Sequence, residues 1–172
     1  MVLISGASQF KKDLPIYTRS GWEIPLPDPS EKPPMQDPRM VRIRATELLE
    51  QGRDRKIRSI SGYPYSCVGM LFASRRAFVE IYHIYDILRH DGYRQISRDD
   101  VTRGDIVLYK YGAEPTHVGM IVQAERLHRS AHVDILVLSK WGKDAEFFHH
   151  IEDVPDNYGN PSEYWTERPE VP

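Results

Sequence analysis

Two neighbouring stretches, Gly104-Asp-Ile-Val-Leu-Tyr109 and Thr116-His-Val-Gly-Met-Ile-Val122, decide the fold of this 172-residue chain. Each is a short, mainly apolar run bounded by Gly, Asp or Pro, which is typical of a strand. Residues 133–138 and 145–149 have the same character and are predicted to be strands. Upstream, residues 39–51 and 67–90 show helical spacing of apolar side chains, and the second segment is long enough to expect a break.

This order of elements predicts the fold class. Helices come first and strands follow, joined by short polar connections. Such an order is expected of an α+β domain in which N-terminal helices pack on an antiparallel sheet. The segment 53–66 and the tail from Pro155 are predicted to be loops.

The N-terminal segment is predicted to be an arm on this domain. Residues 1–38 contain more than half of the chain's 13 prolines, and proline removes a backbone donor and restricts φ. We therefore expect residues 1–38 to form an extended proline-rich arm and residues 39–172 to form the domain. Trp22, Ile24 and Leu26 are candidate anchors; the arm could also serve as a proline-rich ligand or cover a cleft.

Composition and charge exclude several classes of protein. Hydrophobic residues make up 40% of the chain and charged residues 28%, which suits a packed core. A net charge of -2 gives no electrostatic footprint for nucleic acid or an anionic membrane. We find no membrane span and no secretory signal at the start of the sequence. The expected location is the cytoplasm, or export by a specialised route.

Cys67 is the first candidate for chemistry. It is the only cysteine, so no disulfide within the chain and no multi-thiolate zinc site is expected. It opens the second helical segment, where unpaired N–H groups and the helix dipole favour a thiolate. The alternative is a small buried hydrophobic residue, the commonest fate of a lone cysteine.

His117 is the second candidate. It is expected to be the first residue of an apolar strand, directly after a turn, which is a rigid place for a general base. The alternative is a structural histidine at the start of a strand. Taken with Cys67, it suggests a thiol–imidazole pair.

Together these motifs resemble the NlpC-like family of papain-like fold cysteine peptidases and amidases. The resemblance rests on a cysteine opening a helix, then Gly104-Asp105, then His117-Val-Gly119. The chain departs from the family at Ser66-Cys-Val-Gly69, where Asp-Cys-Ser-Gly is usual. The resemblance implies Cys67 as nucleophile and His117 as base, acting without cofactor or metal on a peptide or amide bond.

The resemblance further implies a substrate class and a biological setting. The substrate would be a peptidoglycan stem peptide. The setting would be a delivered effector with an immunity protein as partner, a phage-derived lysis enzyme or an intracellular amidase. Two other readings stay open: an acyltransferase or deamidase on the same fold, and a non-catalytic binding module.

The supporting residues are less narrowly defined. A hairpin turning near residue 128 would place Ser139 opposite His117, and Ser139-Lys-Trp-Gly142 resembles the Asn-Ser-Trp-Gly of papain-like peptidases. Ser139 is thus the predicted third catalytic member, with His149 and Glu146 as alternatives. The Cys67 amide and Tyr63 are predicted to bind the oxyanion, with Ser61 and Tyr65 as alternatives to Tyr63.

Overall fold

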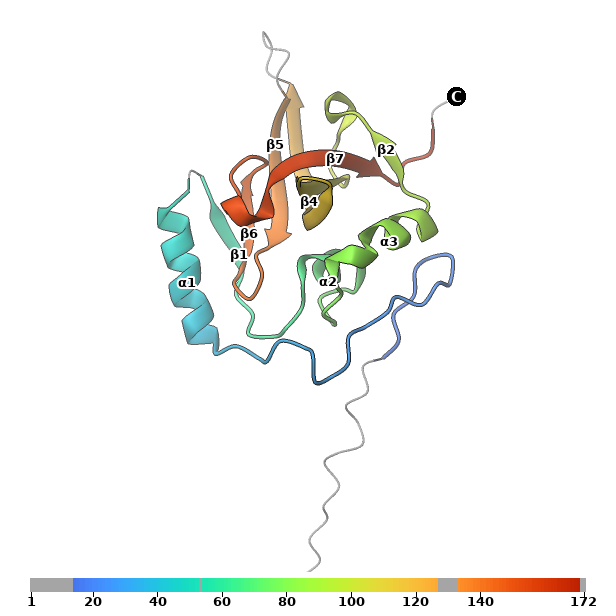
Figure 1. Cartoon of the computed structure of the whole chain (residues 1–172). Helices are drawn as coiled ribbons and strands as arrows, with labels where there is room; N and C mark the ends of the chain where they lie inside the picture. The colour runs from blue at the N-terminus through green and yellow to red at the C-terminus, as the bar shows by residue number, and fades with distance from the viewer. Residues whose placement is uncertain (1–13, 53, 127–132, 171–172) are drawn as a thin grey trace, which may run out of the picture.

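The fold is α+β, built on a seven-stranded antiparallel sheet with few helices (Figure 1). This confirms the predicted class. The computed structural model describes residues 14–52, 54–126 and 133–170. The described elements are α1 (Pro38–Glu50), β1 (Lys56–Ser59), α2 (Cys67–Phe72), η1 (Ile81–His83), α3 (Ile84–His90), β2 (Arg94–Ile96), η2 (Arg98–Asp100), β3 (Ile106–Tyr111), β4 (Glu114–Arg126), β5 (Val133–Lys140), β6 (Glu146–His150), η3 (Asp156–Tyr158) and β7 (Asn160–Thr166).

The sheet has the strand order β1-β6-β5-β4-β3-β7-β2. Strands β3 to β6 are consecutive neighbours, as expected when short connections join antiparallel strands. The register places Tyr109 opposite His117, Met120 opposite Leu138 and Val137 opposite His149.

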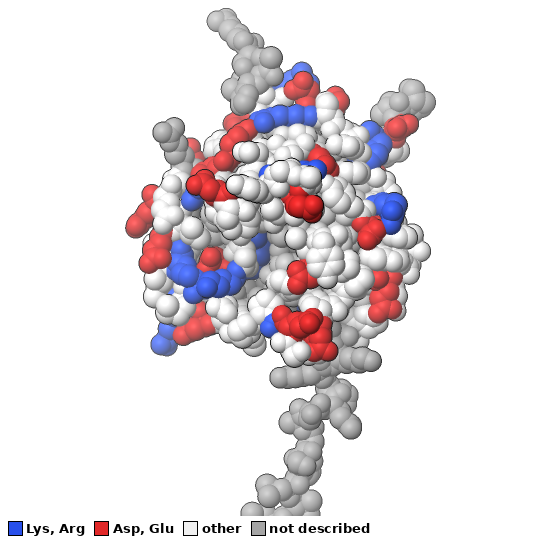
Figure 2. All heavy atoms as spheres, viewed as in Figure 1, with Lys and Arg blue, Asp and Glu red and all other residues white. Residues whose placement is uncertain are grey.

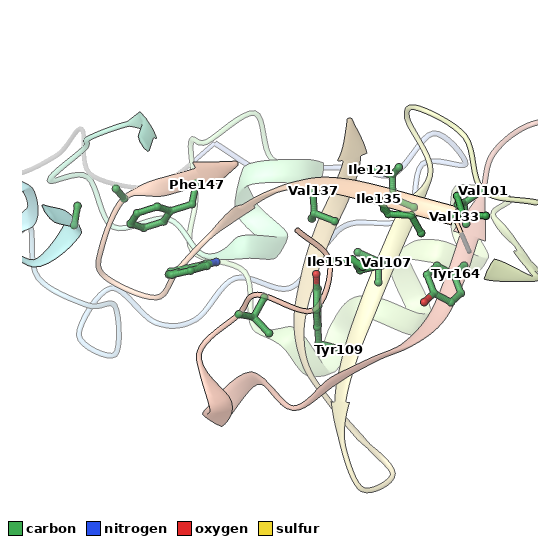
Figure 3. Close-up of a cluster of buried hydrophobic side chains, with 14 residues drawn as sticks. Val101, Val107, Tyr109, Ile121, Val133, Ile135, Val137, Phe147, Ile151 and Tyr164 are labelled. Atoms are coloured by element: carbon green, nitrogen blue, oxygen red, sulfur yellow. The ribbon is translucent and has the colours of Figure 1, made fainter. Parts of the chain in front are cut away.

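Both faces of the central strands are buried. Side chains alternate between faces along a strand, so Val107 packs into one cluster and Leu108 into another. The first cluster contains Val107, Ile121, Ile135 and Val137 (Figure 3) together with Ala45 of α1. The second joins α2 and α3 to the opposite face. Burial on both sides explains why β3 reads as an almost unbroken apolar run.

The break expected within residues 67–90 is present. Helix α2 ends at Phe72, and the chain resumes helical structure only at Ile81. Where the loop after α2 passes the helix, Gly69 lies close to the Ala77 carbonyl oxygen. A Cβ added at residue 69 would stand 2.0 Å from that oxygen. The loop after α2 is thereby packed back against the start of the helix.

Residues 14–37 contain no helix or strand apart from an isolated bridge between Tyr17 and Glu23. Ile16 and Ile24 are nevertheless buried in the cluster beneath α3. The backbone N–H of Arg19 donates to Asp91 at 2.5 Å, beside the end of α3. From there the segment passes along α2 to the start of α1 (Figure 1).

Three strands lie outside the predicted strands, and two of them, β1 and β7, lie in segments predicted to be loops. Strand β1 falls within 53–66, β2 follows α3, and β7 occupies the tail after Pro155. The sequence of β7, Asn-Pro-Ser-Glu-Tyr-Trp-Thr, has a weak strand pattern. Its ladders with β2 and β3 nevertheless place it in the sheet, and Tyr164 and Trp165 pack into the two clusters. His117 is the fourth residue of β4 and not the first, because Glu114 already pairs with Tyr111.

Charged side chains of both signs are interspersed on the face shown in Figure 2. Within the described ranges, no helix is long and apolar enough to span a bilayer.

Candidate functional site

Cys67 and His117 line one pocket of about 170 Å³. Cys67 is the first residue of α2, and His117 projects from β4. Phe78, Gly142 and Tyr158 form part of the same wall. The fold therefore brings together the two residues that the sequence selected, although 50 positions separate them.

The start of α2 holds Cys67 firmly. The Ser66 hydroxyl accepts from the Gly69 N–H at 3.0 Å, which is the N-cap interaction of a helix. Burial raises the pKa of the Cys67 thiol, while N–H groups of Val118, Val68 and Cys67 itself act against that shift, as does the charge of Lys140. Burial dominates, so the thiol is the resting form at neutral pH.

His117 is also neutral at rest. The residue is 1% exposed, and burial holds its pKa well below the ordinary value; the proximity of His149 acts in the same direction, because two protonated rings would repel each other. Its Nε2 atom is buried and has no hydrogen-bond partner among the described residues. A neutral imidazole can accept a proton, so His117 is available as a base beside a protonated thiol.

Aromatic rings hold the His117 ring in place. Tyr158 stacks on it with ring centroids 4.1 Å apart and an angle of 15°, and Tyr109 lies at 5.5 Å. The Thr116 hydroxyl lies within hydrogen-bond distance of the carbonyls of Tyr109 and Tyr158, which ties the loop at Tyr158 to β4. No sequence pattern indicated a role for Tyr158, because it lies in the tail that is predicted to be a loop.

Ser139 belongs to a buried hydrogen-bond chain. The Trp141 indole N–H donates to Ser139 Oγ at 2.9 Å, and Ser139 Oγ lies 2.8 Å from His149 Nε2. His149 Nδ1 lies 2.7 Å from the His150 carbonyl. Because a carbonyl only accepts, Nδ1 carries the proton, and Ser139 donates its hydroxyl proton to Nε2. This chain orients His149.

None of the three candidate third members forms a hydrogen bond to His117 in the described structure. The predicted register was wrong by two residues: the ladder aligns Met120 with Leu138, which puts Ser139 beside Gly119 and not opposite His117. The pairs before the bulge, such as Arg126 with Val133, are three positions away from the predicted register, and the bulge after Ile121 reduces this difference to two.

Glu146 and His149 are three positions apart on β6, so their side chains point to opposite faces of the sheet. Its fully buried carboxylate accepts from the Tyr65 hydroxyl at 2.8 Å and forms ion pairs with Arg75 and Arg58. These partners identify Glu146 as part of a structural ion-pair cluster.

The candidates for the oxyanion site lie outside this pocket. Tyr63 is 44% exposed, lines the neighbouring pocket, and donates its hydroxyl to the Arg76 carbonyl at 3.1 Å. Tyr65 is committed to Glu146, and the Ser61 hydroxyl accepts from the Tyr63 N–H. The predicted backbone donor, the Cys67 N–H, is close enough to its own sulfur to favour the thiolate.

In the part of the chain that the structure describes, no three His, Cys, Asp or Glu side chains gather as a set of metal ligands. Comparison with known proteins found no matching family model, no similar curated protein and no similar solved structure.

Proposed function

We propose that this protein is a thiol-dependent hydrolase of the NlpC-like, papain-like fold that cleaves a peptide or amide bond. The observation that carries the proposal is the shared pocket, which is lined both by the only cysteine of the chain and by a buried histidine whose Nε2 has no partner among the described residues. The placement of the cysteine at a helix start and the histidine on an antiparallel strand supports the finer fold assignment.

The acylation step follows from the neutral resting pair. His117 removes the proton from Cys67 as the sulfur attacks the carbonyl carbon, forming an S–C bond and an oxyanion beside the Cys67 N–H. The tetrahedral intermediate then collapses. The C–N bond breaks, and the departing amine takes the proton from His117.

Hydrolysis of the thioester completes the cycle. His117 removes a proton from water as the water oxygen attacks the thioester carbon. The C–S bond breaks, the carboxylic acid leaves, and Cys67 recovers its proton from His117. Tyr158 acts in both steps as a positioning residue because its ring fixes the plane of the imidazole.

The substrate belongs to the proposal and rests on the motif resemblance. We propose a peptidoglycan stem peptide as substrate, with an immunity protein as partner if the protein is a delivered effector. Purified stem peptides and intact peptidoglycan are the substrates to digest, with mass spectrometry of the products. An added amino acid amide as acceptor separates hydrolysis from acyl transfer, since a hydrolase should still release mainly the carboxylic acid, whereas a transferase should produce mainly the new amide.

The catalytic pair can be tested without knowing the substrate. An activated ester, p-nitrophenyl acetate, should acetylate Cys67, releasing a burst of nitrophenolate and adding one acetyl group to the intact mass. His117→Ala should slow the acetylation by roughly 100-fold or more, in the range expected for loss of a general base.

Two controls define the outcome. Cys67→Ala should show no burst, and His83→Ala should acetylate like the wild type because His83 packs against Tyr82, outside the pocket. Equal acetylation rates in His117→Ala and the wild type would reject the pair and favour a non-catalytic binding module.

A further inference from the structure

A second pocket, of about 250 Å³, adjoins the first and shares Phe78 and Gly142 with it. Its walls are mainly proline and aromatic side chains from the arm, from the segment before α2 and from the loop after α2: Pro33, Pro34, Tyr63, Pro64, Tyr65 and Phe78. The arm therefore forms one side of this pocket and does not line the pocket of Cys67.

A buried lysine lies in this apolar pocket. Lys140, at the end of β5, is 1% exposed, and its ammonium donates to the carbonyls of Gly142 and Asp144, both at 2.6 Å. It also lies 5.2 Å from the centre of the Tyr65 ring. An ammonium has three N–H donors, so one donor remains beyond these two bonds.

The carboxylates nearest to Lys140 have other partners. Glu146 is its cross-strand neighbour, but that carboxylate holds the Tyr65 hydroxyl and two arginines. The Asp144 side chain pairs with Arg44. None of the ion pairs formed within the described ranges includes Lys140. A buried charge without a counter-ion is costly unless a ligand supplies one.

We propose that this pocket binds a carboxylate carried on an apolar or aromatic group, and that Lys140 selects it. A single ammonium with one remaining donor matches a carboxylate monoanion better than a phosphate, which usually recruits several donors. This inference rests on the proposed function in one respect: the pocket adjoins Cys67, so the acidic group belongs to the part of the substrate next to the scissile carbonyl.

Binding is measured in the Cys67→Ala protein, which cannot turn over substrate. The probes are 3-phenylpropionate and its uncharged analogue 3-phenylpropionamide, compared by ligand-observed NMR titration at pH 7. The carboxylate should bind about tenfold more tightly than the amide, as expected for a charge-assisted hydrogen bond in a buried site. Lys140→Met should abolish this preference.

Lys143→Met is the matched control, since Lys143 lines the same pocket but is exposed. It should retain the preference. A preference lost with Lys143 and kept with Lys140→Met, or equal binding of the two probes, would overturn the proposal.

A second measurement covers the case in which Lys140→Met does not fold. Burial lowers the pKa of Lys140 to about 8, against the charges of Asp144, Glu146 and Cys67, with Arg44 acting in the same direction as burial. In Cys67→Ala/Lys143→Met, the carboxylate preference should therefore disappear between pH 7 and pH 10, while amide binding stays constant. A preference unchanged across that range would also overturn the proposal.

The two proposals fail separately. Loss of the carboxylate preference leaves the acetylation of Cys67 unaffected, and an inert Cys67 leaves the binding assay unaffected because that protein has no thiol.

Discussion

At the scale of single residues, burial decides the chemistry of the pair. A helix start favours thiolate, yet α2 has only six residues and Cys67 is half-buried, and this burial raises the pKa of the thiol. Burial lowers the pKa of His117 and so keeps its imidazole neutral. The pocket therefore holds a neutral thiol and a neutral imidazole, and in the proposed mechanism the proton moves only as a substrate is attacked.

The buried histidines predict a stability that falls on acidification. Burial lowers the pKa of His149 to about 4, below the ordinary value of 6.5, and lowers that of His117 as well. Below about pH 6.5 the unfolded chain binds protons that these native histidines do not. The free energy of unfolding should therefore fall between pH 6.5 and pH 4, by up to about 1.4 kcal/mol per pH unit for each histidine.

Urea denaturation at pH 7, 6 and 5 measures this slope. His149→Gln keeps a hydrogen-bonding side chain without the titration and should flatten the slope, whereas His83→Gln should not. An equal slope in wild type and His149→Gln would contradict the assignment.

Ser139 is predicted to contribute to stability more than to catalysis. Ser139→Ala leaves the Trp141 indole and His149 Nε2 buried without partners, which should cost about 1–3 kcal/mol. Because Ser139 forms no hydrogen bond to His117, acetylation of Cys67 should change less than tenfold. Thermal denaturation and the nitrophenolate burst test this together; a 100-fold slower burst at unchanged stability would instead make Ser139 the orienter of His117.

At the scale of elements, Ser66 can cap α2 at the position where the motif that the sequence resembles has aspartate. Serine and aspartate are both favoured N-cap residues, so Ser66 can serve the helix where aspartate is usual. Its hydroxyl also donates to the Val79 carbonyl at 2.6 Å, a bond that an ionised aspartate cannot form. The element is thus fixed at both its start and its return loop by one side chain.

Ser66→Ala should reduce the free energy of unfolding by about 1–2 kcal/mol, through loss of the cap and the link to Val79. Ser66→Thr, which keeps the hydroxyl, should lose much less. Ser162→Ala, at an exposed serine with a local bond to Asn160, serves as the control and should stay within about 0.5 kcal/mol. Equal losses at Ser66 and Ser162 would argue against the cap; urea denaturation makes the comparison.

At the scale of the whole molecule, the proline-rich segment is integral to the packing. Ile24 is 2% exposed and lies in the cluster that also contains residues of α2, α3 and β3. Ile24→Ala should therefore destabilise the whole domain by about 2–4 kcal/mol. Leu14→Ala, at a residue that is 74% exposed, should change stability by less than about 0.5 kcal/mol. Similar effects in chemical denaturation would mean that the segment is only loosely attached.

The sequence by itself determined the α+β class and the central strands, and it singled out Cys67 and His117, which line one pocket. These features depend on local pattern: apolar runs between turn residues give strands, and helical spacing places Cys67 at an element start. The same patterns could not find β1, β2 or β7, which have little strand character and form ladders with β6, β7 and β3, respectively.

Tertiary structure alone decided the surroundings of the pair. The pairing of β4 with β5, for example Arg126 opposite Val133, differs from the register that a turn at residue 128 predicts, so the sequence placed Ser139 opposite the wrong residue. The stacking of Tyr158 on His117 and the position of Lys140 in an apolar pocket each join residues from distant segments. Charge state, orientation and pocket shape arise from such contacts, because burial and distance exist only once the chain has folded.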